Sequence, residues 1–417
     1  MTTLNSPRSR LLTSIPAPQA PPLPPVRPAP LLVAGAIALG LVGYVGVAHD
    51  VKSAVLLALG VGLGVTLFHS RFGFTSAWRQ LVAVGNGSGL RAHALLLGTT
   101  ATLFALVIGT GTGLFGSEPG PSAGPLGVGL LAGAFLFGVG MQLGGACASG
   151  TLFAVGTGQS TIVLTLAGFI AGSVLYAWQF DLVSDLPALP PFVLSDHVGW
   201  FGSWAITIAV LLGVVALTRY IQARRLPPPV GAVPSAKGAI RVIRGSWPML
   251  AGGVVLAALG GAVLVVSGGG WGVTGAFALW GSKLVALLGG NPEAWAYWQQ
   301  EGMAETWAAP LLTDKTTLTD LGIILGAAIA SAAAGAWTLH RKIPPRTAAA
   351  AILGGILMGI GARLASGCNI GAYLGGIASG SLHGWVWGLA AIGGTWVGLR
   401  ARRLFGLSNP KPSDSVC

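Results

Sequence analysis

The sequence comprises 417 residues, of which 53% are hydrophobic and only 8% are charged, with a formal net charge of +12. Soluble domains carry about 25% charged residues, so a chain with so few charges cannot cover a water-exposed surface and must be solvated by lipid. The basic residues lie between apolar stretches and show no basic-aromatic alternation, which argues against a nucleic-acid surface. Only three cysteines are present, including the terminal Cys417, which argues against a disulfide framework.

The apolar stretches predict an all-α polytopic membrane protein with about ten spans, since a spanning helix needs about 20 mostly apolar residues. Residues 1–29 are rich in proline and lack an apolar core, so we expect a disordered cytoplasmic tail. The predicted spans are Pro30–Ala48, Val51–Phe68, Ala94–Leu114, Pro125–Leu143, Thr161–Trp178, Trp200–Leu217, Ser246–Ser267, Leu321–Leu339, Thr347–Leu364 and His383–Leu399. None of these ranges contains a carboxylate, so no acidic ion relay is evident and facilitated passage is favoured over pumping.

The charged residues between the predicted spans alternate in sign along the chain. The connector after the fifth span is acidic and holds Asp181, Asp185 and Asp196. The connector after the sixth span is basic and holds Arg219, Arg224, Arg225, Lys237, Arg241 and Arg244. Because cytoplasmic loops carry an excess of Lys and Arg, this pattern predicts a multi-pass membrane protein with both termini in the cytoplasm.

Two motifs occur twice. The stretch "RFGFTSAW" (Arg71–Trp78) matches "GWGVTGAF" (Gly270–Phe277), and "GVGMQLGGACASG" (Gly138–Gly150) matches "GIGARLASGCNIG" (Gly359–Gly371). The second copy begins an odd number of predicted spans after the first, so the two copies have opposite orientations. The sequence therefore predicts an inverted-topology repeat, the architecture of many transporters.

These boundaries divide the chain into six parts. The parts are the tail 1–29, an additional N-terminal span 30–50, a first transport repeat 51–178, a connecting span with a basic cytoplasmic linker 179–245, a second transport repeat 246–399 and a cytoplasmic tail 400–417.

The cysteine frames predict re-entrant segments. Too few apolar residues follow Cys147 and Cys368 for another crossing, so we expect each chain to turn back near mid-membrane as a half-helix. Cys147 would enter from the cytoplasm and Cys368 from outside, and the free N–H groups of both half-helices would form an anion site. Ser149, Ser366 and Asn369 flank the cysteines and are candidate donors. A thiol in apolar surroundings keeps its proton and is a soft donor suited to a sulfur-bearing anion.

Other interpretations of these motifs are open or excluded. Buried cysteines and glycines can serve packing alone. "GVGMQLGG" lies in a predicted membrane helix and not after a strand, so it does not indicate a dinucleotide site, and two lone cysteines do not make a metal site. We expect His69, His93 and His340, near the ends of predicted spans, to be interfacial rather than ligands.

Both cysteine frames resemble the paired signatures of the YeeE/YedE family of bacterial membrane proteins, over about Val51 to Leu399. The resemblance implies an hourglass-shaped helical bundle with short inward helices, and thiosulfate uptake through S–H···S hydrogen bonds from cysteines on a central path. Cys147 and Cys368 match two of the family's cysteines. The chain departs from the family at Gly73, where thiosulfate-transporting members have a further cysteine.

The sequence thus predicts a transporter or channel for thiosulfate or a related small sulfur anion, and neither an enzyme nor a cofactor-binding protein. Cys147, Cys368, Ser149, Ser366, Asn369 and Gly73 are the candidate path residues. A membrane thiol-redox protein or sulfur carrier that forms cysteine persulfides is the alternative, and it would need a basic residue beside a low-pKa thiol. Arg363 lies five residues before Cys368 on the preceding helix, and the direction of its side chain is open. A soluble cytoplasmic sulfur-handling protein is a further candidate partner.

Overall fold

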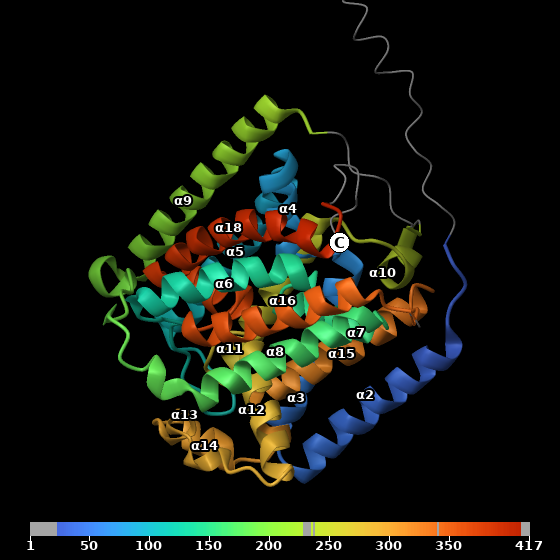
Figure 1. Cartoon of the computed structure of the whole chain (residues 1–417), viewed down its shortest axis with the longest axis horizontal. Coiled ribbons are helices and arrows are strands. Elements are labelled where there is room, and N and C mark those ends of the chain that lie inside the picture. The colour runs from blue at the N-terminus through green and yellow to red at the C-terminus, as the bar shows by residue number, and fades with distance from the viewer. Residues whose placement is uncertain (1–22, 228–234, 237, 340–341, 410–417) are drawn as a thin grey trace, which may run out of the picture.

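The computed structural model describes residues 23–227, 235–236, 238–339 and 342–409, which form a bundle of helices (Figure 1). The strands in this part of the chain are β1 (Leu126–Gly127) and β2 (Ala188–Leu189), which pair antiparallel with Leu126 opposite Leu189. The predicted all-α polytopic membrane fold is confirmed. Most of the predicted N-terminal tail, together with Cys417 and His340, lies outside the described residues.

Within the described ranges, nine helical segments are long and apolar enough to cross a membrane. The long helices are α2 (Pro28–Ala48), α3 (Val51–Ser70), α5 (Ser88–Thr110), α6 (Val128–Gly144), α8 (Ser160–Trp178), α9 (Ser195–Arg225), α11 (Met249–Ser267), α15 (Lys315–Ala333), α16 (Pro345–Leu364) and α18 (Leu382–Ala401). With 20 residues, α18 is long enough to span, but its glycines and tryptophans lower its mean hydropathy.

Four short helical segments lie among the long ones. They are α4 (Phe74–Val84), α7 (Ala148–Gly156), α12 (Thr274–Leu287) and the π-helical turn Asn369–Leu374 that continues into α17 (Gly375–Ala378). The segments after Cys147 and Cys368 are short helices that follow a break in the chain. The sequence did not predict α4 and α12 as helices, although each begins inside one of the duplicated motifs.

The remaining elements are short and lie in connectors. They are α10 (Arg241–Arg244), α13 (Ala296–Gln299), α14 (Met303–Ala308) and the 3-10 turns Phe180–Leu182, Gly238–Ile240, Pro292–Ala294, Leu311–Thr313 and Arg402–Phe405.

The start of α15 corrects one prediction. The helix begins at Lys315 and not at Leu321, because the side chain of Asp314 caps it by accepting a hydrogen bond from the N–H of Thr317 at 2.7 Å. Asp320 therefore lies inside a membrane helix and not in a connector. The prediction that no carboxylate lies within a span is wrong.

Corresponding helices of the two halves run in opposite directions. The N–H of Trp247, just before α11, donates to the carbonyl of His69 at the end of α3 at 2.7 Å, so the two helices are antiparallel. Packing partners are exchanged between the halves: α8 packs on α16 as α6 packs on α18, and α3 packs on α15 as α5 packs on α11. The short helices follow this relation, since α4 and α12 lie at opposite ends of the bundle (Figure 1).

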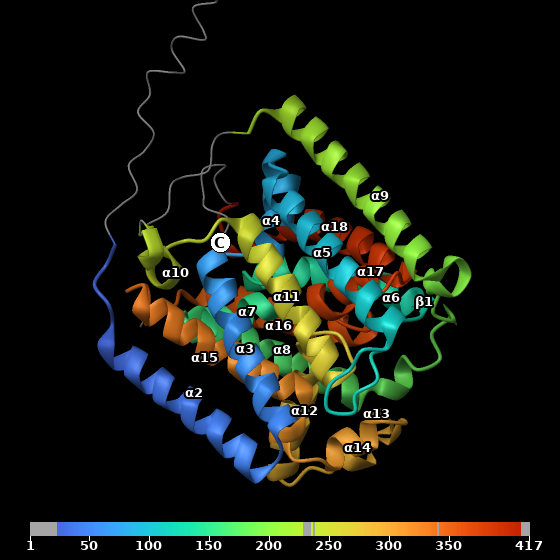
Figure 2. The same cartoon turned by 180° about the vertical axis from the view of Figure 1, so that it is seen from behind.

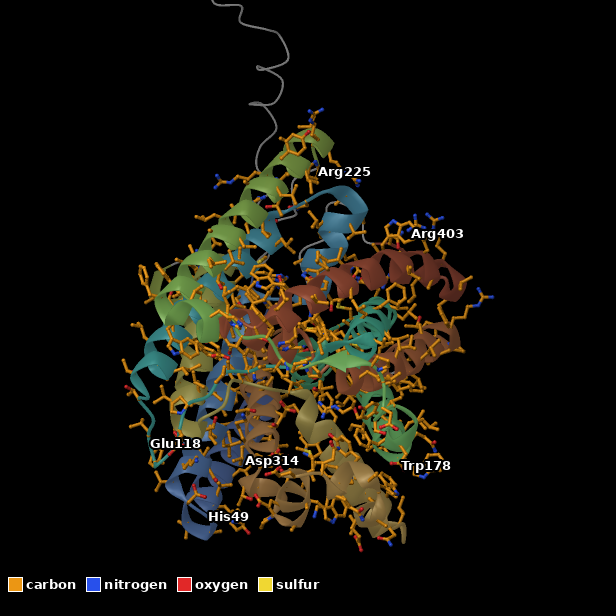
Figure 3. All side chains as sticks on the ribbon, turned by 90° about the vertical axis from the view of Figure 1, so that its left-hand side faces the viewer. His49, Glu118, Trp178, Arg225, Asp314 and Arg403 are labelled. Carbon is orange, nitrogen blue, oxygen red and sulfur yellow. The ribbon has the colours of Figure 1, made fainter. Side chains whose placement is uncertain are left out.

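The two ends of the bundle carry opposite charges. Arg225 and Arg403 lie at one end, which we call the basic end, while Glu118 and Asp314 lie at the other, the acidic end (Figure 3). Helices α2 and α9 run along opposite flanks, outside the duplicated helices (Figures 1 and 2). A kink at Gly199 (φ +69°) separates the first turn of α9 from its straight part.

Glycines allow the two halves to pack backbone to backbone. A Cβ atom at Gly355 in α16 would collide with the carbonyl oxygen of Thr165 in α8, and one at Gly168 with that of Ile352. Between membrane helices, small residues replace the hydrophobic driving force by close van der Waals contact. The α8–α16 interface therefore depends on these glycines.

We predict that Gly355→Val destabilises the bundle, because overpacking a tight interface costs about 1–3 kcal/mol or more. Gly40→Val in α2 is the matched control, since a Cβ there meets nothing within 4 Å. The midpoint of thermal unfolding of the solubilised protein should fall for Gly355→Val and stay near wild type for Gly40→Val. Equal midpoints for the two variants would contradict this account of the interface.

Candidate functional site

Cys147 occupies the N-terminal cap of α7. Gly145, with φ +87°, turns the chain out of α6, and Cys147 is extended (φ −81°, ψ −173°) before α7 begins. Its thiol is 2% exposed and lies 3.7 Å from the hydroxyl of Ser149. The first N–H groups of α7 have no partner within the helix, so they form the positive end of its dipole beside the thiol.

Cys368 occupies the same position in the second half. Ser366 (φ +57°) and Gly367 (φ +139°) turn the chain out of α16, and the indole N–H of Trp387 donates to the carbonyl of Gly367 at 3.2 Å. The Cys368 thiol is fully buried. Asn369 is fully buried as well, and no described residue is a hydrogen-bond partner of its side-chain amide. A buried amide without a partner is costly, so this one is available to a ligand.

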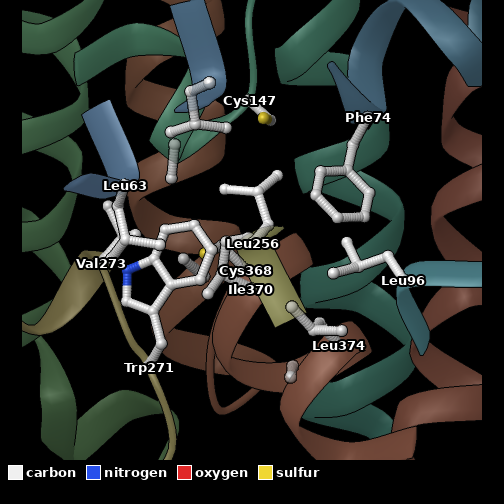
Figure 4. Packing of buried hydrophobic residues seen from close by; sticks show 14 of the residues in the cluster. Leu63, Phe74, Leu96, Cys147, Leu256, Trp271, Val273, Cys368, Ile370 and Leu374 are labelled. Carbon is white, nitrogen blue, oxygen red and sulfur yellow. The ribbon is translucent and has the colours of Figure 1, made fainter. Parts of the chain in front are cut away.

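Both cysteines belong to one apolar cluster at the centre of the bundle (Figure 4). Side chains from both halves build this cluster, among them Leu63, Leu256 and Ile370. Cys368 lies near Cys147, since the segments that follow the two cysteines contact each other. The two re-entrant segments therefore meet near the middle of the molecule, one from each half.

A cavity of about 270 Å³ reaches Cys147 from the basic end. Arg71, Gly73, Thr75 and Arg79 line it together with Cys147, whereas Cys368 does not. A cavity needs only about 10–15 Å³ of this kind of volume to hold one water molecule, so this cavity has room for a small anion together with several waters. Cys147 therefore lies at the end of this cavity, whereas Cys368 is fully buried.

The mouth of this cavity is electropositive. Arg71 and Arg79 line it, and Arg402 lies close to Arg79 and donates to the carbonyl of Gln142, near the end of α6, at 2.6 Å. Burial, together with the charge of Arg79, lowers the pKa of Arg402 to about 10, so it remains charged at neutral pH. A mouth lined by charges of one sign concentrates ions of the opposite sign, here anions.

The sequence left open where the side chain of Arg363 points. Its guanidinium donates to the hydroxyl of Thr274 at 2.6 Å and to that of Tyr297 at 3.1 Å. In the other half, Gln142 occupies the corresponding place in the motif and donates to the carbonyl of Thr75 at 3.4 Å. The residue five positions before each cysteine therefore contacts the short helix of its own half: Gln142 contacts α4, and Arg363 contacts α12.

Only some of the residues predicted from the sequence lie at the cavity. Gly73 caps α4 and lines the cavity, and Ser149 lies beside Cys147. Asn369 is buried next to Cys368. Ser366 is exposed and faces the connector at Gly124, so it does not lie on this cavity.

His69 and His93 are both buried in the bundle, and their depth in the membrane stays a prediction. His93 packs against Phe72 and Phe74, which flank Gly73, with ring centroids 5.2 and 4.4 Å away. The ring of His69 stacks on Trp247 and its Nδ1 lies 2.9 Å from the carbonyl oxygen of Gly245.

Comparison with known families assigns the chain. Residues 69–397 match the model of a family described as "Sulphur transport", which covers both halves of the bundle. The chain belongs to this family. The resemblance to YeeE/YedE proteins that the cysteine frames indicate is therefore confirmed.

Individual members of the sulphur transport family are similar over different lengths. The thiosulfate transporter TsuA of Spirochaeta thermophila is 29% identical over 357 residues, which is 82% of this chain and 96% of that protein. The probable transporters YedE of Escherichia coli and Salmonella typhimurium are each 38% identical over 139 residues, about a third of either chain. The match to TsuA thus extends over nearly the whole bundle.

The cavity makes a prediction about thiol reactivity in this family member. In detergent, a small methanethiosulfonate reagent should modify Cys147 faster than Cys368, because only Cys147 lines the cavity. The comparison uses Cys417→Ala protein in which either Cys147 or Cys368 is replaced by Ser, with modification followed by intact-mass spectrometry. Faster modification of Cys368 would show that the cavity does not define the open side.

Proposed function

We propose that this protein moves thiosulfate, or a related small sulfur-containing anion, across the bacterial inner membrane along a path through Cys147 and Cys368. The observation that carries the proposal is the cavity with a basic mouth that ends at the Cys147 thiol. The similarity to a thiosulfate transporter over most of the chain supports the choice of anion.

The cavity chemistry suits a soft dianion. Arg71 and Arg79 attract the anion to the mouth, and the N–H groups at the start of α7 favour negative charge at its end. The Cys147 thiol then donates a hydrogen bond to the terminal sulfur atom, which is more polarisable than oxygen. Cys368 and the amide of Asn369 offer the same kind of donors on the other side.

The inverted repeat supports alternating access between the two cysteines. The acidic-end side is closed by the connector before β1, in which the N–H of Ser122 donates to the hydroxyl of Ser379 at 2.9 Å, and Gly124 lies against Ser366 and His383. Exchanging the conformations of the two halves would open this side and close the cavity at Cys147. In inverted-repeat transporters, such an exchange carries substrate past a fixed central site.

The thiol-redox alternative has weaker support. It requires a thiolate stabilised by a neighbouring base or cation. Arg363, the cation nearest in the motif, donates instead to Thr274 and Tyr297. Neutral thiols that donate hydrogen bonds fit these surroundings better than persulfide chemistry does.

We further propose that the basic end faces the cytoplasm, as the excess of arginine there favours. Single cysteines at Ser184 and Ser235, in a background with Cys417→Ala, test the orientation with an impermeant thiol reagent on intact cells. Ser184→Cys should be labelled from outside, and Ser235→Cys only after the membrane is opened. The reverse pattern would invert the assignment without affecting the fold.

Cysteine substitutions test the path. Removing one thiol donor should weaken the bound anion by about 1–3 kcal/mol, about five- to a hundredfold, because a buried charge loses a partner. Cys147→Ala and Cys368→Ala should therefore reduce uptake of labelled thiosulfate severely at matched membrane levels. Cys→Ser at either position keeps a donor but replaces a soft atom by a hard one, so partial activity is expected.

Two controls complete this test. Cys417→Ala should transport like wild type, and thiosulfate-dependent growth of a strain without other sulfur uptake should require the wild-type protein. Full uptake in both Cys147→Ala and Cys368→Ala would reduce the cysteines to packing residues. Absence of thiosulfate-dependent growth with well-expressed wild-type protein would argue for a different anion.

A further inference from the structure

Asp320 is the one carboxylate residue among the described residues that is buried. It lies in α15, its side chain is 0% exposed, and neither carboxylate oxygen has a hydrogen-bond partner in the described chain. Asp50 and Asp314 behave differently, because each caps a helix by accepting an N–H at 2.7 Å. Asp320 has no such structural task.

An ionised carboxylate in this place would be costly. In an apolar interior without a partner, such a group gives up its charge by taking up a proton. Ionisable residues inside membrane spans are rare and mark ion pathways by default. In this conformation we therefore expect Asp320 to hold a proton.

Asp320 lies on the face of α15 that packs against the first re-entrant segment. One turn further along, Ile324 and then Ala327 contact Gly156 of α7, and residues four apart share a helix face. Cys147 is the N-terminal cap of α7, and Asp320 also lies near Cys368. The carboxylate is therefore close to the place where the two cysteine segments meet.

The charged groups around Asp320 are occupied elsewhere or lie at the helix ends. Lys315 donates to the carbonyl of Gly270 at 3.1 Å, and Asp314, which interacts with Asp320 by charge, caps α15. Lys52, at the start of α3, lies near Lys315. These three groups lie toward the acidic end.

The other helices packed on α15 add no ionic partner. Lys283 of α12 donates to the carbonyl of Trp307, and Arg244 of α10 donates to the carbonyl of Ala333 at the far end of α15. Helix α7 carries no charged side chain, and α2 carries none either. His69, near the end of α3, has its Nδ1 2.9 Å from the carbonyl oxygen of Gly245. The titratable groups that face the centre are therefore Asp320, the two cysteines, and His93 and Tyr373, which both pack on Phe74.

We propose that Asp320 is a proton-binding site that couples passage of the anion to movement of a proton in the same direction. This inference rests on the proposed anion transport. An ionised Asp320 would repel a dianion held at the thiols, whereas a protonated one would not. Proton and anion therefore strengthen each other's binding by the same factor, as thermodynamic linkage requires.

The coupling has a physical purpose for uptake. A dianion that enters a cell moves against an interior-negative membrane potential. A proton that enters with it cancels part of that charge and contributes the free energy of its own gradient. A proton needs only one carboxylate as its site, which is what the interior of α15 supplies.

The first measurement is the pH dependence of thiosulfate binding to the purified full-length protein. For wild type, the dissociation constant of thiosulfate should rise about tenfold per pH unit once the pH exceeds the pKa of Asp320. The reason is that the free protein has then lost the one proton that binding of the anion requires. Asp320→Asn keeps the size and neutrality of the protonated side chain, so its binding should be independent of pH over the same range. An equally steep dependence in Asp320→Asn would overturn the assignment of the proton to Asp320.

The second measurement uses proteoliposomes and labelled thiosulfate. An inward proton gradient should stimulate wild-type uptake at least fivefold, a protonophore should abolish the stimulation, and Asp320→Asn should lack it. Asp50→Asn is the matched control, because Asn also caps a helix, and it should keep the response. Stimulation by a sodium gradient and not by a proton gradient would overturn the proposal.

Failure of coupling and failure of transport are distinguishable in this system. Thiosulfate exchange by wild type at equal pH on both sides requires transport but no gradient. Exchange without any response to a proton gradient would refute coupling and leave anion transport intact, whereas no exchange would refute both. If Asp320→Asn does not fold, thiosulfate-driven proton entry in wild type, followed with a pH-sensitive dye inside the vesicles, decides the matter by its presence or absence.

Discussion

Lipid cannot hydrogen-bond to a peptide group, and the arrangement of this protein depends on that constraint. The chain leaves helical geometry twice near the centre, at Gly145 before Cys147 and at Ser366 before Cys368. Such breaks persist in a membrane only inside protein or beside a polar cavity. The long helices of each half supply that enclosure, since α6 and α8 pack on α18 and α16 of the other half. One half alone would leave its broken segment exposed to lipid, so the repeat is a structural requirement for having the site at all.

Close packing then limits where a cavity can form. Where α8 meets α16, glycines such as Gly355 bring backbones into contact and leave no room for a substrate. The cavity that reaches Cys147 lies instead among α4, α7 and the end of α3, where the chain is short-helical and polar groups such as Thr75 and Arg79 gather. Rigid long helices and short inner helices therefore divide the tasks of holding the fold and lining the path.

The sequence predicted what duplicated residues and apolar length encode. It identified the cysteine frames, the inverted repeat and all the long helices. It missed α4 and α12, which follow glycines at the ends of spans and are too short to cross the membrane. It placed Asp320 outside the membrane, because a single carboxylate next to a polar connector looks like the end of a span; the cap at Asp314 decides otherwise. The directions of Arg363 and Ser366 depend on tertiary contacts with Thr274 and Gly124, which spacing does not encode.

The two halves are related in backbone but not in chemistry, and this difference bears on direction. Gln142 in the first half corresponds to Arg363 in the second, and Ala148 to Asn369. On the Cys147 side, the cavity has a mouth lined by Arg71 and Arg79. On the other side, Cys368 lies next to the buried amide of Asn369 and near the carboxylate of Asp320. An anion that crosses from one thiol to the other therefore leaves one electrostatic environment for another, although the folds around them match. In the proposed alternating-access mechanism, the inverted repeat would provide two equivalent conformations, and the unequal side chains would give them unequal affinities.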